Sequence, residues 1–157
     1  MQEFESDSEI LEFAISREVE SFQFYTALSK RMAQPEMQKL MKELAEEELE
    51  HKTRLELEIL KTGKTVDPGD PYKFSEEEYT IEGEFIFDMG FQELLLMAIE
   101  KEKMAFELYA DMSGKVHDEN SRETLLALAE EEIKHKQRFE FEYEVMLKNG
   151  NFKKKQE

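Results

Sequence analysis

The chain has 157 residues, enough for one domain with a sizeable hydrophobic core and too few for two comfortable ones. Its 38 acidic and 21 basic residues give a formal net charge of -17, which repels nucleic-acid phosphates and anionic lipid head groups. We therefore expect neither nucleic acid nor a membrane as a partner. The absence of cysteine excludes disulfides, zinc ribbons, iron–sulfur clusters and thiolate chemistry.

No targeting or membrane segment is evident in the sequence. The acidic start lacks a basic stretch followed by an apolar one, and no apolar run approaches the ~20 residues of a membrane helix. We therefore expect a cytoplasmic protein. Twelve Phe and nine Met supply material for a packed interior, and only three Pro and six Gly interrupt the chain, so we expect long helices.

Breakers and caps predict four helices in a single domain over residues 1–157. The first is predicted over 7–33, after a capping box at residues 6–9. The second is predicted over 35–62, because Pro35 suits a first helical turn and Gly63 suits the position beyond a helix end. The third, over 89–113, is closed by Gly114, and the fourth is predicted over 119–149.

Residues 64–87 separate the second and third predicted helices. They contain Pro68, Gly69, Pro71 and Gly83 and have no sustained helical period. Extended, such a segment covers up to ~80 Å, ample to traverse a helix of ~40 Å. It predicts a long crossover.

An internal repeat relates the two halves of the chain. Shifting the sequence by 84 residues places Ala14 on Ala98 and aligns both helix pairs without a gap. The motif at 44–48 and His51 then matches the motif at 128–132 and His135. The chain is predicted to be a duplicated helical hairpin.

Polar residues occupy the apolar stripe of each predicted helix. Glu18 lies between Ala14 and Phe22 at spacings of four, and the repeat places Glu102 in the same way. Residues 40, 44, 48, 51 and 55 are spaced by three and four, which puts a carboxylate and an imidazole on the inward face of the second helix. The fourth helix repeats this pattern.

Buried carboxylates in a chain of this charge need positive partners, and no Lys or Arg lies on these stripes at matching height. Two divalent cations would offset four Glu charges and accept two neutral imidazoles. Carboxylate and imidazole ligands without sulfur favour iron or manganese. A solvated helix face is the ordinary explanation for any one of these residues, but it does not explain six in register.

The sequence resembles the rubrerythrin branch of the ferritin-like di-iron carboxylate proteins. The resemblance covers residues 8–148 and rests on Ala-Ile-x-x-Glu with Tyr seven residues later, paired with Leu-Ala-Glu-Glu-Glu-x-x-His. It implies an all-α, ferritin-like four-helix bundle with two iron ions, or manganese in one or both positions. The metal ligands it implies are Glu18, Glu48, His51, Glu102, Glu132 and His135, with Glu48 and Glu132 as bridges.

Two departures from the rubrerythrin pattern affect function. The chain ends without the Cys-ligated rubredoxin-type domain, so electrons are expected from an external donor such as a rubredoxin-type protein. The family's additional Glu, one turn after the ligand Glu of the third helix, is replaced by Ala105, and the repeat equivalent is Ser21. Iron movement during peroxide reduction depends on that carboxylate in the family.

Tyr25 and Tyr109 lie two turns after Glu18 and Glu102 on the same faces, where each could bond a ligand carboxylate or relay an electron. Core filling is an equal alternative, and His117 is expected to be an exposed loop residue. Some phenylalanines lie off the central stripes and predict a second apolar face, hence a homodimer. These are Phe13, Phe24, Phe91 and Phe141.

The resemblance implies reduction of hydrogen peroxide or dioxygen at the metal pair, an oxidoreductase activity. The first alternative is iron handling, in which ferroxidation precedes storage or delivery and the acidic surface attracts Fe²⁺. The second is a structural bundle that has lost its metals. The second alternative is disfavoured because all six ligand positions carry a residue that can bind metal.

Overall fold

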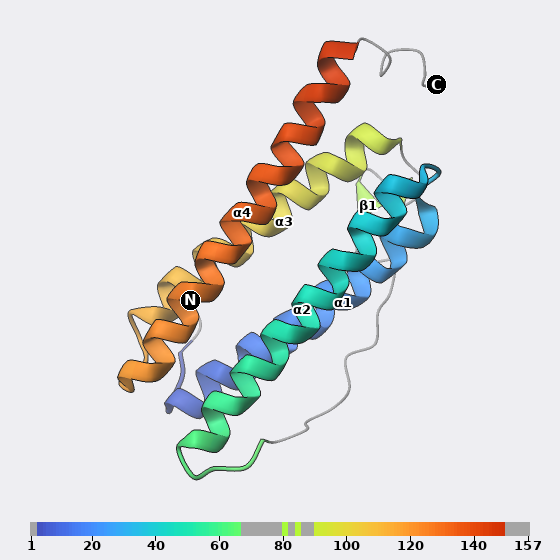
Figure 1. The fold of residues 1–157 in the computed structure, drawn as a ribbon. Helices are drawn as coiled ribbons and strands as arrows, with labels where there is room; N and C mark the ends of the chain where they lie inside the picture. Colours follow the sequence, from blue (N-terminus) through green and yellow to red (C-terminus); the bar gives the residue numbers. More distant parts are fainter. Residues whose placement is uncertain (1–2, 67–79, 82–83, 86–89, 150–157) are drawn as a thin grey trace. The chain divides into compact units, whose positions relative to one another are not determined.

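The fold was determined as a computed structural model and is described for residues 3–66, 80–81, 84–85 and 90–149. Four helices carry the described chain: α1 (Asp7–Arg31), α2 (Pro35–Lys61), α3 (Phe91–Ser113) and α4 (Glu119–Asn149) (Figure 1). Two short strands, β1 (Thr80–Ile81) and β2 (Glu84–Phe85), pair antiparallel, with Thr80 opposite Phe85. The rest of the predicted crossover, at 67–79, 82–83 and 86–87, lies outside the described residues.

The helix ends follow the capping signals of the sequence. The Ser6 hydroxyl accepts a hydrogen bond from the Glu9 N–H at 3.2 Å, while the Glu9 carboxylate accepts one from the Glu5 N–H at 2.8 Å. In the expected capping box, the Glu9 carboxylate would accept from the N–H of Ser6. It accepts instead from the N–H of Glu5, one residue earlier. Helix α1 ends two residues before the predicted boundary, because Met32 already has an extended backbone with φ -77 and ψ 131.

Helix α2 begins with Pro35, as predicted, and ends at Lys61, one residue before the predicted boundary. Gly63 follows with φ +81, a left-handed conformation that glycine adopts without steric cost. Its N–H donates to the Leu60 carbonyl at 3.0 Å. Glycine at this position therefore closes α2.

The chain divides into two compact units, which are described separately. Unit 1 comprises residues 1–74 and 109–126, and unit 2 comprises 75–108 and 127–157. The division falls inside α3 and inside α4, so each of these helices contributes residues to both units.

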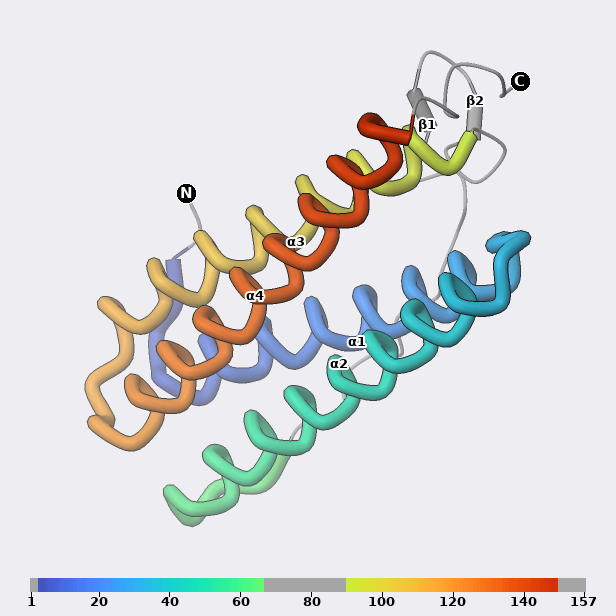
Figure 2. The backbone as a smooth tube through the Cα atoms, turned by 45° about the horizontal axis from the view of Figure 1, so that its top comes forward, coloured from blue at the N-terminus to red at the C-terminus, as the bar shows by residue number. Residues whose placement is uncertain are grey.

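Unit 1 is built on the hairpin of α1 and α2, which lie side by side (Figure 2). Its core contains fully buried side chains from both helices, among them Phe24, Leu28, Leu55 and Ile59. Burial of each such side chain contributes about 1.5–3 kcal/mol through the hydrophobic effect. The apolar periodicity of the sequence thus positions the inward faces that carry the site residues.

The turn between α3 and α4 belongs to unit 1 and is held by polar contacts. Asp7 at the start of α1 accepts hydrogen bonds from the N–H groups of His117 at 3.0 Å and Asp118 at 2.9 Å. Burial raises the pKa of Asp7, but these bonds outweigh it and hold the pKa below its ordinary value. Asp118 in turn caps α4 by accepting from the Ser121 N–H at 2.9 Å.

Unit 2 contains α3 up to Leu108 and α4 from Ala127, and these segments also lie side by side (Figure 2). Leu95, Ala98, Leu128 and Phe139 are buried. The interior of each unit is therefore assembled from helical stripes of the kind the sequence predicts.

No helix among the described residues is both long enough and apolar enough to cross a bilayer.

Candidate metal centre

Unit 1 brings together Glu18 of α1 with Glu48 and His51 of α2. The His51 Nδ1 lies 3.1 Å from Glu48 Oε1 and 3.5 Å from Glu18 Oε2. Glu48 and His51 are three residues apart, so both project from one face of α2 toward the residue supplied by α1. We call these three residues triad 1.

Unit 2 contains the repeat equivalent, formed by Glu102 of α3 with Glu132 and His135 of α4. The His135 Nδ1 lies 3.1 Å from Glu132 Oε1 and 3.5 Å from Glu102 Oε1. These two distances equal those in unit 1, so the repeat in the sequence is also a repeat in site geometry. We call these three residues triad 2.

Both triads are buried. Five of the six residues are at most 2% exposed, and His135 is 8% exposed. Carboxylates at such positions are tolerated only with positive partners, because burial of an unpaired charge costs several kcal/mol. The first partner in each triad is its histidine.

In triad 2 the histidine holds a proton strongly. Burial lowers the pKa of His135, but hydrogen bonding to Glu102 and Glu132 outweighs this and raises the pKa to about 12. The carboxylates of Glu102 and Glu132 therefore favour the protonated, positively charged form of the His135 imidazole. A metal ion would take the place of that proton, since an imidazole binds metal through a deprotonated nitrogen.

The donor set fits a divalent metal ion in each triad. Two carboxylates and one imidazole each offer an atom, and the three atoms lie within 4.8 Å of one another. Two carboxylates balance the charge of one divalent cation. Oxygen and nitrogen donors without sulfur suit iron or manganese.

Tyr109, at the end of α3 in unit 1, donates its hydroxyl hydrogen bond to Glu18 Oε2. The tyrosine therefore contacts a candidate ligand on α1 rather than one on its own helix. Tyr25 is also fully buried and packs edge-on against Phe24, with ring centroids 5.2 Å apart and planes at 72°. The bond from Tyr109 fixes the orientation of one carboxylate in triad 1.

Glu58 is a buried carboxylate that was not predicted from the sequence, as is Glu20. Glu58 of α2 is 6% exposed and accepts a hydrogen bond from the Thr124 hydroxyl at 2.8 Å. Lys61 lies 3.4 Å from the same oxygen. The spacing from His51 through Leu55 to Glu58, four then three, is the signal that indicates its inward position.

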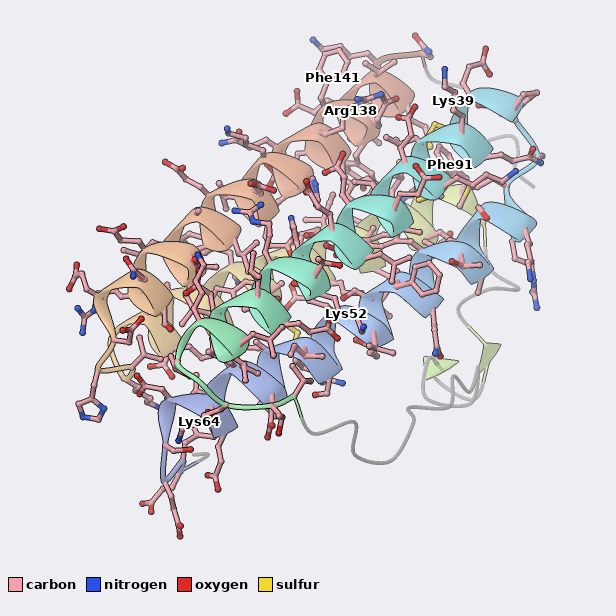
Figure 3. The ribbon with its side chains drawn as sticks, turned by 60° about the horizontal axis from the view of Figure 1, so that its bottom comes forward. Lys39, Lys52, Lys64, Phe91, Arg138 and Phe141 are labelled. Atoms are coloured by element: carbon pink, nitrogen blue, oxygen red, sulfur yellow. The ribbon has the colours of Figure 1, made fainter. Side chains whose placement is uncertain are left out.

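The other predicted features have mixed outcomes. The His117 side chain is exposed, as expected, although its Nδ1 lies 3.3 Å from Asp7. The expectation that Phe24 contributes to an outer apolar face is wrong, because the side chain is fully buried in unit 1. Phe141 is exposed on α4 (Figure 3).

Comparisons with known proteins agree with the fold and the donor set. Helices that present buried carboxylates and histidines at these spacings are typical of the helical-bundle proteins that bind metal through carboxylates. The family model described as Rubrerythrin matches residues 9–89, just over half of the sequence. The chain belongs to the rubrerythrin family.

A solved structure supports the fold class. The chain is similar to a hypothetical protein from Pyrococcus furiosus, with 26% identity, a TM-score of 0.68 and coverage of 91% of each chain. No curated protein matches the sequence. The prediction of an all-α, ferritin-like four-helix fold is confirmed.

Proposed function

We propose that the chain is a two-metal oxidoreductase that reduces hydrogen peroxide or dioxygen with electrons from an external donor. The observation that carries the proposal is the pair of buried triads with matching geometry, at an offset of 84 residues, in a member of the rubrerythrin family. Such a duplicated donor set is typical of two metal ions.

The bound metals, two iron ions or manganese in one or both positions, supply the redox chemistry. Reduction of one hydrogen peroxide consumes two electrons and two protons and releases two water molecules. A rubredoxin-type protein is the proposed electron donor, because the 157-residue sequence contains no cysteine with which to build an iron–sulfur or rubredoxin-type site.

The residues of the chain have separate tasks in this proposal. Glu18, Glu48 and His51 would hold one metal ion, and Glu102, Glu132 and His135 would hold the other. Tyr109 holds Glu18 in one orientation through its hydroxyl. The low exposure of both triads limits access of bulk water to the reacting atoms.

Single-turnover oxidation tests the proposal. Anaerobically reduced, iron-loaded protein should be reoxidised by peroxide far faster than the variant Glu48→Ala/Glu132→Ala, because that variant lacks one carboxylate in each triad. The control is Glu46→Ala/Glu130→Ala, which removes two exposed carboxylates that are also repeat equivalents. Equal rates in wild type and the first variant would defeat the proposal.

Repeated cycles of reduction and oxidation separate peroxide reduction from iron handling. An oxidoreductase of the proposed kind retains its iron through repeated cycles of reduction and oxidation. A ferroxidase that stores or delivers iron instead releases or accumulates ferric iron after each addition of Fe²⁺. Iron content before and after repeated cycles distinguishes the two.

A further inference from the structure

Ser21 is a buried serine in the middle of α1. It is 9% exposed and lies seven residues after Ala14 and seven before Leu28, both of which are fully buried. A spacing of seven residues returns to the same face of a helix, so Ser21 lies on the inward stripe of α1. A hydroxyl in such a stripe calls for a hydrogen-bond partner, because burial of an unpaired polar group costs free energy.

Three other helical serines bond to their own helix. The hydroxyls of Ser16, Ser29 and Ser113 each donate to the carbonyl three residues earlier, at 2.7 Å. The Ser21 hydroxyl makes no such bond, and it has no other hydrogen-bond partner among the residues that the structure describes. Its hydrogen is therefore available to a ligand from outside the chain.

Ser21 is a neighbour of triad 1. It follows Glu18 by three residues, which places it about 4.5 Å further along α1 and about 60° around the helix. Residues at this spacing are adjacent on a helix surface, and both lie in unit 1 with Glu48 and His51. Glu18 already accepts a hydrogen bond from the Tyr109 hydroxyl. Ser21 thus adds a second hydroxyl, not yet bonded, beside the same triad.

Unit 2 has no hydroxyl at the equivalent position. The residue 84 positions after Ser21 is Ala105, which is half-buried and follows Glu102 by three residues. The two triads have the same donor residues and the same distances between them. Serine in one unit and alanine in the other is therefore a chemical difference between the surroundings of two matched triads.

We propose that the Ser21 hydroxyl donates a hydrogen bond to the small oxidant at triad 1, so that hydrogen peroxide or dioxygen binds beside this triad in preference to triad 2. The inference rests on the proposed function and adds to it which triad the oxidant binds beside. Ionised carboxylates accept hydrogen bonds and cannot donate them, so they offer no donor to a ligand whose oxygen atoms carry lone pairs. The neutral serine supplies a donor without adding charge to the triad.

Azide binding to the iron-loaded, oxidised protein gives the first test, because azide is a small anion that accepts hydrogen bonds and its binding to ferric iron changes the visible absorbance. Ser21→Ala should raise the azide dissociation constant about tenfold through the loss of one hydrogen bond. Ser29→Ala is the matched control and should bind azide like wild type, because it removes a buried hydroxyl that already bonds within α1. Equal dissociation constants for wild type and Ser21→Ala would overturn the proposal, as would a wild type that binds no azide.

Transfer of the hydroxyl to the other unit tests the preference between the triads. In the double variant Ser21→Ala/Ala105→Ser, unit 2 has the serine and unit 1 has the alanine. The azide dissociation constant should return to within about threefold of wild type, because the repeat gives the new serine the same position relative to its ligand Glu. A double variant that binds azide as weakly as Ser21→Ala does would contradict the proposal.

Iron content and peroxide titration separate the role of Ser21 from the proposed function. All variants should retain the iron content of wild type, because Ser21 is not a metal ligand, and loss of iron in Ser21→Ala would overturn the proposal. The peroxide concentration that gives half the maximal reoxidation rate should rise in Ser21→Ala but not in Ser29→Ala. A reduced wild type that peroxide does not reoxidise would defeat the proposed function. Reoxidation of wild type and Ser21→Ala with the same half-saturating peroxide concentration would overturn only the role of Ser21.

Discussion

The hydroxyl of Tyr109 donates a hydrogen bond to Glu18 Oε2, which joins residues from the end of α3 and the middle of α1. Both side chains are buried in unit 1. The same Glu18 oxygen lies 3.5 Å from the Nδ1 of His51. One hydroxyl therefore orients a carboxylate that belongs to triad 1.

Tyr109→Phe should weaken metal binding at triad 1. The substitution keeps the ring and removes the donor, so the Glu18 carboxylate loses one restraint on its orientation. Loss of such a supporting bond typically lowers metal affinity about 10–100-fold. Competition with a chromophoric chelator measures the effect, and Tyr143→Phe, at a half-buried position, is the matched control. Equal affinities for all three proteins would contradict the role assigned to Tyr109.

Ala105→Glu should increase the rate of reoxidation by peroxide. The resemblance to rubrerythrins places a further carboxylate at this position, one turn after Glu102, and Ala105 is half-buried. We expect a several-fold increase in single-turnover rate with unchanged metal content. Ala105→Gln has the same size without the charge and should remain at the wild-type rate. Identical behaviour of the Glu and Gln variants would show that the missing carboxylate is not what limits the reaction.

Asp7→Asn should destabilise the protein in a pH-dependent manner. The folded-state pKa of Asp7 lies below the ordinary 3.8, because the N–H groups of His117 and Asp118 bind its carboxylate. A depressed pKa contributes stability that is present above 3.8 and is lost as the pH falls through the folded-state value.

The difference in unfolding free energy between wild type and Asp7→Asn should therefore be about 1 kcal/mol at neutral pH. It should shrink as the pH falls below 3.8, the ordinary pKa of Asp. Urea unfolding of both metal-free proteins across this range measures it. A difference in unfolding free energy that grows as the pH falls would contradict this prediction.

Gly63→Ala should cost about 1 kcal/mol of stability, because Gly63 has φ +81 and a side chain there is strained even though no atom lies within 4 Å of the new Cβ. Gly63→Asn should cost less, since Asn tolerates the left-handed region better. Gly114→Ala is the matched control, because its Cβ would make only an ordinary contact of 3.5 Å with the Asp111 carbonyl oxygen. Thermal unfolding that ranks Gly114→Ala as the more harmful change would contradict this reasoning.

Much of the helical structure could be predicted from the sequence because its signals are local. The starts of α1, α2 and α4 fall where caps and Pro35 place them. The start of α3 is two residues later than predicted, at Phe91 rather than 89. Periodicity also indicated which face of each helix is buried.

Contacts between helices could not be predicted in the same way. Tyr109 was expected near a ligand carboxylate, but its partner on α1 depends on how helices distant in sequence pack. Glu58 was overlooked because a single Glu in a highly charged chain is usually exposed. The Asp7 contacts with the α3–α4 turn likewise join residues 110 and 111 positions apart.

The proposed two-metal centre is tested most directly by equilibrium binding of Fe²⁺ under anaerobic conditions, with iron and manganese content measured in the purified protein. We expect about two ions per chain in wild type and in the exposed control Glu46→Ala/Glu130→Ala. The variant Glu48→Ala/Glu132→Ala should bind less than one ion tightly. Wild-type protein that binds neither metal, or that binds iron no better than the Glu48→Ala/Glu132→Ala variant does, would contradict the account.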